Sequence, residues 1–267
     1  MTISIGVVGC LGRMGSELVK KIIQDKNTNF SGGFEHASHK DINKIIGDVL
    51  GCVSDKKILD NGKDIFDNSD VVIDFTIPQS TKLNIDLAME TKTSLVIGTT
   101  GLDETVMNLI NKASNIVPII QSPNMSVGVN VLINLVEKSA AALSASNYDI
   151  EISETHHKHK IDAPSGTALT LGKFAAKGRN ENFNDIKVLD RTKISKERKN
   201  SEIGFSVTRG GEIPGEHTVS FIGSNDRIDL QHKAYSRSIF VSGAIEAAHF
   251  IVKKRPGLYT MKDVINF

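Results

Sequence analysis

The chain has 267 residues, which is enough for one or two domains and for a buried core that needs neither disulfides nor a metal. Its 32 Lys and Arg residues nearly balance 31 Asp and Glu residues, and the formal net charge of +1 gives no sign of a nucleic-acid partner. The two cysteines, Cys10 and Cys52, are too few for a disulfide framework and favour a reducing compartment.

The sequence shows no targeting or membrane-spanning segment. The apolar N-terminus is too short for a signal core and has no basic start. The apolar stretch 239–252 is interrupted by Glu246 and His249 and is shorter than the roughly 20 residues that a spanning helix needs. We therefore expect a soluble cytoplasmic protein with no membrane partner and no nucleic-acid partner.

The first half of the chain alternates short apolar runs with helical spacing. The runs predict strands at 3–8, 30–35, 71–75, 95–97 and 116–120, and the spacing predicts helices at 13–25, 81–91 and 103–114. The helix at 81–91 is expected to bury Leu83, Leu87 and Ala88. Strands that alternate with helices in this way indicate a parallel sheet with right-handed crossovers.

The pattern changes near Ser126. Helices are predicted at 127–145 and 165–177, and polar–apolar alternation predicts half-exposed antiparallel strands at 148–154, 204–209, 217–222 and 227–232. The charged segment 180–200 is predicted to be a mobile surface loop, with its basic run 191–199 in solvent. The glycine-rich stretch 209–219 is predicted to be a hairpin, and the residues leave open whether His217 is functional or structural.

A glycine motif, Gly9-Cys10-Leu11-Gly12-Arg13-Met14-Gly15, follows the first predicted strand and opens the first predicted helix. Such glycines let the backbone approach a pyrophosphate, which the helix N-terminal amides then bind. The acid Glu35, twenty residues after Gly15, stands where a carboxylate can accept hydrogen bonds from ribose hydroxyls. A plain glycine turn is the alternative, but strand, glycines, helix and acid together favour dinucleotide binding.

Three further segments follow predicted parallel strands directly. They are Asp74-Phe75-Thr76, Ile97-Gly98-Thr99-Thr100-Gly101 and Gln121-Ser122-Pro123-Asn124-Met125. Ligands of open parallel sheets lie beyond the carboxyl ends of the strands, so the three segments could wall one crevice. Ordinary loop chemistry is the alternative for each segment.

The stretch from His156 to Leu169 holds three of the eight histidines within four residues. Zinc binding is possible for imidazoles, but two lysines interleave and no cysteine is near, and a solvated basic strand end is a second alternative. An anion site with acid–base groups fits better, because lysine and histidine attract carboxylates. The turn Ser165-Gly166-Thr167 opens a helix and offers a second anion pocket. Two anion sites and a dinucleotide suggest a small dicarboxylate that gains or loses hydride.

At these residues the chain resembles the 4-hydroxy-tetrahydrodipicolinate reductase (dihydrodipicolinate reductase) family of the diaminopimelate route to lysine. The resemblance runs essentially end to end. It rests on the glycine motif, Asp74-Phe75-Thr76, Gly98-Thr99-Thr100-Gly101, the segment 123–130, the segment 154–169, Gly215-Glu216-His217 and Pro256-Gly257-Leu258-Tyr259.

The resemblance implies an α/β fold of two domains. A Rossmann-type parallel-sheet domain for the dinucleotide would comprise 1–126 and 239–267, and an α+β domain with a mixed, largely antiparallel sheet would bind substrate and build a homotetramer from 127–238. The implied cofactor is NADH and/or NADPH, and no metal is implied. The implied cofactor contacts are Gly9, Cys10, Leu11, Gly12, Arg13, Met14, Glu35, His36, Gly98, Thr99, Thr100, Ser122, Pro123, Asn124 and Met125.

The resemblance further implies His156 as the acid–base residue and Lys160 as a proton donor. Substrate contacts are implied at His157, Lys160, Ser165, Gly166 and Thr167. The implied reaction gives hydride from NAD(P)H to a conjugated cyclic imine, formed as the 4-hydroxyl leaves as water, and yields tetrahydrodipicolinate. Hydride addition leaves an enamine that must be protonated on carbon, which His156 and Lys160 can do.

Two other functions remain as alternatives. One is another NAD(P)-dependent dehydrogenase of similar architecture, such as aspartate dehydrogenase, and the other is a nicotinamide-sensing or scaffold protein. Some residues depart from the commonest family pattern: Cys10-Leu11 replaces small residues, Lys158 replaces a common arginine, and His36 stands where many relatives carry arginine. His36 beside Glu35 predicts that NADH is used at least as well as NADPH.

Overall fold

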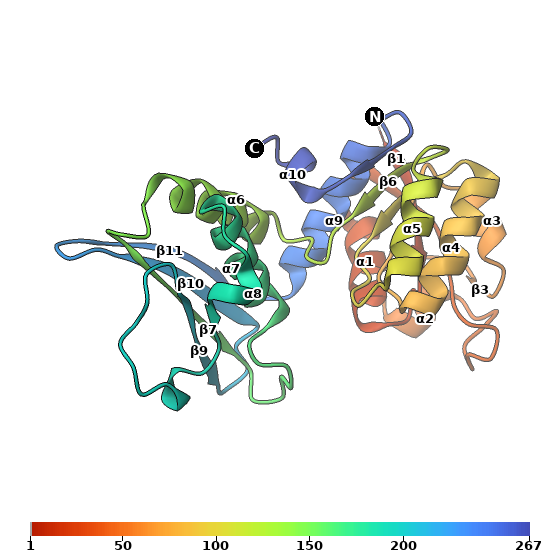
Figure 1. The fold of residues 1–267 in the computed structure, drawn as a ribbon. Helices are drawn as coiled ribbons and strands as arrows, with labels where there is room; N and C mark the ends of the chain where they lie inside the picture. Colours follow the sequence, from red (N-terminus) through yellow and green to blue (C-terminus); the bar gives the residue numbers. More distant parts are fainter. Residues whose placement is uncertain (1) are drawn as a thin grey trace. The chain divides into compact units, whose positions relative to one another are not determined.

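The computed structural model describes residues 2–267, and the chain divides into two units (Figure 1). The first unit runs up to Val127 and resumes over Ser238–Asn266. The second unit is Gly128–Arg237 with Phe267, whose ring lies 4.3 Å from the Lys138 ammonium. The binding of cofactor by the first part of the chain and of substrate by the second remains a prediction.

The first unit is built on a seven-stranded sheet in which every pairing is parallel. The strand order is β12-β6-β5-β4-β1-β2-β3. The central strands β1, β4 and β5 are short, rich in β-branched residues and buried on both faces, as central parallel strands require. The predicted parallel sheet is therefore confirmed. The strands are β1 Ile3–Val8, β2 Thr28–Phe34, β3 Ile58–Leu59, β4 Val71–Asp74, β5 Ser94–Ile97, β6 Pro118–Gln121 and β12 Gly257–Tyr259.

Helices cover both faces of this sheet, which makes the unit a Rossmann-type layered fold. One apolar cluster joins the sheet to α1 Arg13–Gln24, α2 Ile46–Leu50, α9 Ser238–Ile251 and α10 Met261–Val264. A second cluster, on the other face, joins it to α3 Gly62–Asp67, α4 Pro78–Thr91 and α5 Glu104–Ala113. No helix among residues 2–267 is long and apolar enough to cross a membrane.

Helix α4 buries only part of the expected face: Ala88 is fully buried and Leu87 packs against the core, as predicted, but Leu83 does not. Leu83 is 65% exposed, whereas Thr81 and Asn84 are buried. The Thr81 hydroxyl donates to Thr99, and the Asn84 amide donates to the fully buried Asp74 carboxylate. These bonds satisfy a buried carboxylate, so polar pairing as well as leucine spacing sets the rotation of the helix.

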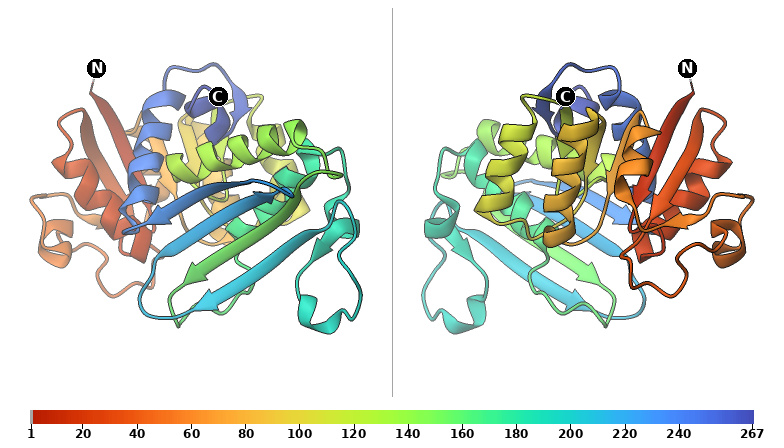
Figure 2. Two further views of the ribbon diagram at one scale, coloured as in Figure 1. Left: turned by 90° about the vertical axis from the view of Figure 1, so that its left-hand side faces the viewer. Right: turned by 90° about the vertical axis from the view of Figure 1, so that its right-hand side faces the viewer.

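The second unit holds a five-stranded mixed sheet in the order β11-β10-β7-β9-β8. Helices α6 and α7 pack on one face of it, and the left view of Figure 2 looks onto the other face. The strands are β7 Asp149–His156, β8 Lys187–Val188, β9 Ile203–Arg209, β10 Gly215–Ile222 and β11 Arg227–Ala234. The helices are α6 Val127–Ala142, α7 Gly166–Gly178, α8 Phe183–Ile186 and the single 3₁₀ turn Arg191–Lys193.

Two expectations for this sheet are wrong. β10 is antiparallel to β7 and β11, but β9 runs parallel to β7, because the chain crosses over through α7 before it returns. The stretch 209–219 is not a hairpin either, since β7 lies between β9 and β10. Polar–apolar alternation marks a half-exposed strand, but it does not carry the direction of that strand.

The segment 180–200 is also more structured than expected. It contains α8, β8 and the 3₁₀ turn. Arg198 is not free in solvent: its guanidinium donates to the carbonyl of Ile150 at 2.9 Å and pairs with the Glu151 carboxylate. The carboxylates of β7 therefore attract part of the basic run and hold it against the sheet.

The register of the sheet places four polar side chains together. In the β7–β9 ladder His156 lies opposite Arg209, and in the β7–β10 ladder Glu154 lies opposite His217. Residues opposite one another, or two apart along a strand, point to the same face. Glu154, His156, Arg209 and His217 consequently share the helix-covered face of the sheet.

Candidate functional site

The glycine motif forms a tight turn between β1 and α1. Gly9 has a φ of +62°, and the Gly12 amide donates to the Gly9 carbonyl at 2.9 Å. A Cβ at Gly15 would lie 2.0 Å from the Gly9 oxygen, so only glycine allows the helix to approach this closely. No side chain caps α1 at Gly12. The first amides of α1 are therefore left for another acceptor, as a pyrophosphate site requires.

Glu35 lies beside this turn. Its Oε1 accepts a hydrogen bond of 2.7 Å from the Leu11 amide, and its Oε2 accepts none from residues 2–267. The structure thus brings the predicted ribose acceptor to the glycine motif and leaves one carboxylate oxygen for a ligand. Its neighbour His36 is exposed, with Nδ1 at 2.8 Å from the Ser38 hydroxyl.

The side chains of the other glycine-motif residues differ in accessibility. Cys10 is fully buried, and burial, followed by the charge of Glu35, raises the pKa of its thiol to about 12. Cys10 can therefore offer a ligand only its backbone. Leu11 and Met14 are half-buried against the core of the first unit, and Arg13 is exposed.

The ends of β4, β5 and β6 are neighbours in the sheet, as the three strand-end segments predict. Thr99 is buried and its hydroxyl bonds to Thr81 and Asp74, so its side chain is structural and only its backbone can face a ligand. Thr100 is exposed, and Gly98 packs on Phe75, where a Cβ would lie 2.4 Å from the ring.

The segment 122–125 forms its own turn after β6. The Ser122 hydroxyl donates to the Asn124 carbonyl at 2.8 Å, and the Asn124 side-chain oxygen accepts from the Ser126 amide at 2.9 Å. Met125 is buried in the core, whereas Pro123 is exposed. The turn is thus held by its own hydrogen bonds, which would present its backbone in a fixed conformation to a bound cofactor.

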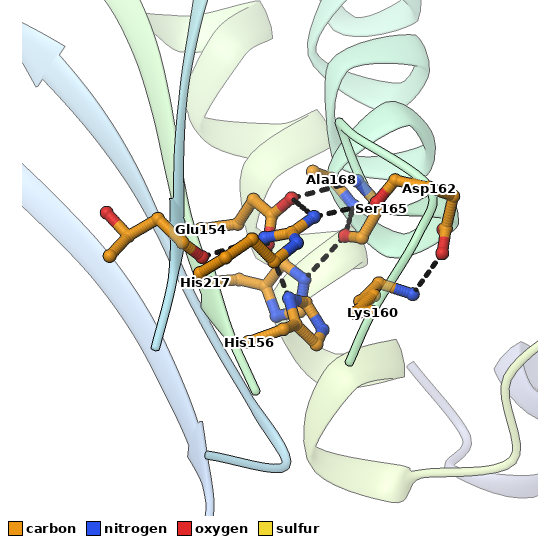
Figure 3. Close-up of polar contacts among 9 residues, drawn as sticks. Glu154, His156, Lys160, Asp162, Ser165, Ala168 and His217 are labelled. Atoms are coloured by element: carbon orange, nitrogen blue, oxygen red, sulfur yellow. Dashed lines mark hydrogen bonds and ion pairs between the residues drawn. The ribbon is translucent and has the colours of Figure 1, made fainter. Parts of the chain in front are cut away.

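In the second unit, the Glu154 carboxylate is the centre of a buried polar network (Figure 3). Its side chain is fully buried on β7. Oε1 accepts from the Ser165 amide at 2.9 Å and from Arg209 Nη2 at 2.8 Å. Oε2 accepts from Arg209 Nη1 at 2.9 Å and from His156 Nδ1. Burial favours the neutral acid, but these four donors outweigh it and lower the pKa of Glu154.

His156 uses only one ring nitrogen in this network. Because an ionised carboxylate only accepts, Nδ1 carries the proton of the neutral imidazole. Nε2 makes no hydrogen bond with residues 2–267, and a Cβ at Gly215 would lie 2.9 Å from it. Burial lowers the pKa of His156, although Glu154 acts to raise it. At neutral pH the residue is therefore a neutral imidazole with a free basic nitrogen.

His217 completes the cluster from β10. Its ring stands at 75° to that of His156, with 5.0 Å between the centroids, and its Nε2 lies 3.0 Å from the Ser165 hydroxyl. The same hydroxyl accepts from the Ala168 amide at 3.1 Å and so caps α7. Burial lowers the pKa of His217 to about 3, which keeps its ring neutral. His217 therefore positions Ser165 rather than exchanging protons.

The predicted proton donor, Lys160, and the residues predicted to bind the substrate carboxylates lie in the segment that follows His156. Lys160 Nζ donates to Asp162 at 2.8 Å, and this bond lowers the pKa of Asp162. The Nδ1 of His157 is buried without a partner among the described residues. Gly166 is exposed, and a Cβ there would meet no atom within 4 Å. The turn into α7 therefore borders open space, where a substrate carboxylate would fit.

The same atoms raise the question of a metal. Ligand atoms of Glu154, His156 and His217 lie within 4.8 Å of one another. Both oxygens of Glu154 are, however, already bonded to the Arg209 guanidinium, which would repel a cation at this position. The donor set fits a hydrogen-bonded acid–base network better than a metal site.

Two members of the network were not among the predicted site residues. Glu154 precedes His156 by two on one strand, and this spacing is a usable signal, because i and i+2 share a face of a sheet. Arg209 gives no comparable signal, since it meets Glu154 across 55 residues. The role of His217, left open by the sequence, is that of a buried partner of Ser165.

Comparisons with known proteins bear on both units. The family model "Dihydrodipicolinate reductase, N-terminus" matches residues 3–125, and "Dihydrodipicolinate reductase, C-terminus" matches residues 128–265. The chain is 40% identical over 264 residues to the 4-hydroxy-tetrahydrodipicolinate reductase of Nitrosospira multiformis, with 99% of this chain and 98% of that protein covered. It is 42% identical over 268 residues to the protein of that name from Wolbachia sp. subsp. Drosophila simulans, with 99% and 100% covered.

A solved structure agrees in fold. The dipicolinate-bound dihydrodipicolinate reductase from Paenisporosarcina sp. TG-14 matches with a TM-score of 0.77 and 22% identity, covering 97% of this chain and 98% of that one. Family models that together span nearly the whole chain, and relatives at about 40% identity over their full length, lead to one conclusion. The chain belongs to the dihydrodipicolinate reductase family.

Proposed function

We propose that this protein reduces 4-hydroxy-tetrahydrodipicolinate to tetrahydrodipicolinate, with NAD(P)H as the reductant and loss of water, in the diaminopimelate pathway of lysine biosynthesis. The observation that carries the proposal is the buried Glu154–His156 pair, which leaves a neutral imidazole with a free Nε2 beside the segment 157–167. The names of the relatives agree with this activity. An aspartate dehydrogenase or a non-catalytic sensor is not favoured, because neither would need this segment.

The first unit fits a dinucleotide cofactor. The uncapped first turn of α1, the close approach that Gly15 permits and the free Oε2 of Glu35 suit a pyrophosphate and a ribose. The bound nicotinamide supplies the hydride. We assign binding of the cofactor to the glycine motif, Glu35 and the segments 98–100 and 122–125. Glu35 would accept from the ribose hydroxyls, which favours NADH at least as much as NADPH.

The second unit supplies anion binding and protons. His157, the Lys160 ammonium and the first residues of α7, Gly166 and Thr167, would hold the two substrate carboxylates. Ser165 would act indirectly, because its amide and hydroxyl are already bonded to Glu154, Ala168 and His217. The reaction consumes one proton overall: the 4-hydroxyl leaves as water, hydride adds to the conjugated ring, and the resulting enamine takes a proton on carbon. His156 Nε2 can take up and return a proton, and Lys160 retains two N–H donors beyond its bond to Asp162.

We further propose a homotetramer in the cytoplasm. The face of the five-stranded sheet opposite α6 and α7 carries exposed polar side chains such as Ser206, Thr208 and Gln231, a surface on which a second copy can pack. Both cysteines are free thiols, which suits a reducing compartment. A light-scattering mass four times that of the 29.0 kDa chain would support the assembly, and a monomer mass would reject it.

The catalytic assignment is tested by His156→Ala and Lys160→Ala. Each variant is expected to lose about 10²–10⁴-fold in turnover, because each removes a proton-transfer group. The affinity for NADH, measured by fluorescence, is expected to stay unchanged, because neither residue belongs to the first unit. Turnover is followed by NADH oxidation with enzymatically generated 4-hydroxy-tetrahydrodipicolinate, and in parallel with oxaloacetate plus ammonia.

His159→Ala is the matched control. His159 lies in the same segment but is 69% exposed, and its nearest acid is Glu212 at 3.9 Å, so its loss is expected to leave turnover unchanged. Near-normal turnover in both His156→Ala and Lys160→Ala would refute the assignment of these residues. NADH oxidation only with oxaloacetate and ammonia would refute the proposed substrate.

A further inference from the structure

We infer that Glu154 and Arg209 act together as a positioning pair for His156: Arg209 fixes the Glu154 carboxylate, and Glu154 keeps the imidazole proton on Nδ1, so that Nε2 is the proton-transfer atom. This inference rests on the proposed function, in which His156 is the acid–base residue. Neither Glu154 nor Arg209 has to touch the substrate to act in this way.

The first step is that every acceptor position of Glu154 is filled. Each oxygen accepts two hydrogen bonds, from Arg209 and Ser165 at Oε1 and from Arg209 and His156 at Oε2. A carboxylate with four donors in a buried position stays ionised. The carboxylate can therefore only accept from His156, and this fixes the tautomer of the ring.

The second step is that Arg209 is itself anchored at the point where it meets Glu154. Its fork donates with both Nη atoms to the carboxylate, and the same atoms donate to the carbonyls of Thr208 at 2.8 Å and Asp162 at 2.7 Å. Arg209 therefore joins β9, β7 and the loop that carries the Lys160–Asp162 pair. A lysine could supply the charge but not these parallel bonds.

The third step concerns the charges that face His156. The charged groups are Glu154 on the same strand, Arg209 on β9 and Lys160 in the following loop. His217 on β10 also faces the ring but is neutral. Arg209 and Lys160 both disfavour the imidazolium, whereas Glu154 favours it. Arg209 thus has two effects on His156: it holds the carboxylate that orients the ring, and its charge lowers the pKa of that ring.

The main test is Glu154→Gln, which keeps the shape of the side chain. A glutamine amide facing His156 would donate to Nδ1 and move the imidazole proton to Nε2. We expect a loss of about 100-fold or more in kcat, with unchanged NADH affinity, because the basic nitrogen is no longer available. In ¹⁵N NMR of the histidine-labelled enzyme, the His156 signals should exchange from the Nδ1–H to the Nε2–H pattern, a change that a merely structural role would not cause.

Two further variants separate folding from positioning. Glu154→Gln leaves the Arg209 charge unpaired, so the double variant Glu154→Gln/Arg209→Met is expected to be more stable than Glu154→Gln yet equally slow. Arg209→Met alone should raise the pKa seen in the pH profile of kcat/KM, because a positive charge facing His156 is gone. Compared with Arg209→Met, Arg209→Lys should return the pKa of the kcat/KM profile to the wild-type value, because the charge is present again. It should recover only part of the lost kcat, because lysine cannot make the two parallel bonds to Glu154.

Glu151→Gln is the matched control. Glu151 lies on the same strand and also pairs with an arginine, Arg198, but it does not contact His156. Its substitution should change neither kcat nor the His156 tautomer. The inference is overturned if Glu154→Gln keeps normal kcat or the wild-type tautomer while His156→Ala is inactive. If His156→Ala is itself active, the proposed function has failed instead, and the two failures are thus distinguishable.

Discussion

Two glutamates, Glu35 in the first unit and Glu154 in the second, differ in the number of hydrogen bonds that their carboxylates accept. Glu35 is partly exposed and accepts one hydrogen bond, from the Leu11 amide, which leaves Oε2 unbonded among the described residues. Glu154 is fully buried and accepts four. A carboxylate with unused acceptor positions can bind a ligand, whereas a saturated one can only hold its neighbours in place.

The same contrast extends to the surroundings of the two residues. The first turn of α1, beside Glu35, has no side-chain cap, whereas α7, beside Glu154, is capped by Ser165, which is bonded to His217. Within the first unit, the start of α1 and one oxygen of Glu35 are thus without partners among the described residues, although other polar groups of that unit, such as Asp74, are paired. The second unit pairs its polar groups internally so that one imidazole nitrogen stays free in a fixed place.

Among the tests of this comparison between Glu35 and Glu154, the largest effect is expected from Gly15→Ala in the glycine motif beside Glu35. The new Cβ would lie 2.0 Å from the Gly9 carbonyl oxygen, so the glycine turn must move away from α1. We expect a cost of about 1–3 kcal/mol in the free energy of unfolding from overpacking. The NADH dissociation constant should rise by about tenfold or more, since every 1.4 kcal/mol is a factor of ten.

Ser16→Ala, at the next position of α1, is the control for this experiment. It removes only a hydrogen bond of 3.3 Å to the Arg13 carbonyl and should leave NADH binding intact. Titrations of NADH fluorescence and urea unfolding curves check both variants. A Gly15→Ala protein that binds NADH normally would show that the glycine turn does not carry the cofactor.

A smaller effect is expected from His36, which sharpens the comparison by adding a charge beside Glu35. The wild type should use NADH at least as well as NADPH, because Glu35 repels a 2′-phosphate and the imidazole of His36 lacks the bidentate fork of an arginine. His36→Arg should gain about tenfold in kcat/KM for NADPH if it adds one charge-assisted contact of about 1.4 kcal/mol.

The control is Ser38→Ala, which removes the hydroxyl 2.8 Å from His36 Nδ1 without adding charge. Its ratio of kcat/KM values for the two cofactors should match that of the wild type. Initial rates with both cofactors at pH 7.5 provide the measurement. A strong NADPH preference in the wild type, or an unchanged ratio in His36→Arg, would place recognition of the adenosine ribose elsewhere.

The smallest effect is expected in the buried network around Glu154. It is a change in the free energy of unfolding with pH that is caused by His217. Burial lowers the pKa of His217 from 6.5 to about 3, so on acidification the unfolded chain takes up a proton that the folded chain does not. The stabilising effect is therefore fully present above pH 6.5 and declines as the pH falls. From pH 7 to pH 6, His217 should account for a loss of about 0.7 kcal/mol in the free energy of unfolding.

His217→Gln removes this titration and can still bond to Ser165. Urea unfolding at pH 7 and at pH 6, at one protein concentration, should show a smaller decline for the variant than for the wild type. His232, on β11 opposite His217, also has a pKa lowered by burial, so His232→Gln should flatten the dependence in the same direction. Equal declines in wild type and His217→Gln would mean that His217 is protonated in the folded protein.

Much of the first unit could be predicted from the sequence, because its signals are local. β1, β4 and β5 are short, β-branched runs that end at glycine or polar residues, and the structure has them within a residue or two of the predicted ranges. In α4 the packing of Leu87 and Ala88 was predicted correctly, but the exposure of Leu83 was not, because Thr81 and Asn84 are buried through hydrogen bonds to residues on other elements. Periodicity identifies a helix but does not show which polar groups meet a buried partner.

The second unit was harder to predict, because its organisation depends on long-range pairing. Alternation located β7, β9 and β10, but the parallel course of β9 follows from a crossover of more than forty residues. The residues of the segment 156–169 were found through local composition. Arg209 was not, because its importance exists only once β9 lies beside β7. Local patterns therefore located the site but not the partner that holds its central carboxylate.

The geometry of the site depends on the register in which β9 pairs with β7. Side chains alternate between the two faces of a sheet, so a slip of one residue along β7 would point the Arg209 guanidinium to the face opposite Glu154. The carboxylate would then be buried without its main counter-charge, and the misregistered sheet would be both unstable and inactive. The contact between Arg209 and Glu154 thus depends on the native alignment of the two strands, so loss of that alignment would remove stability and activity together.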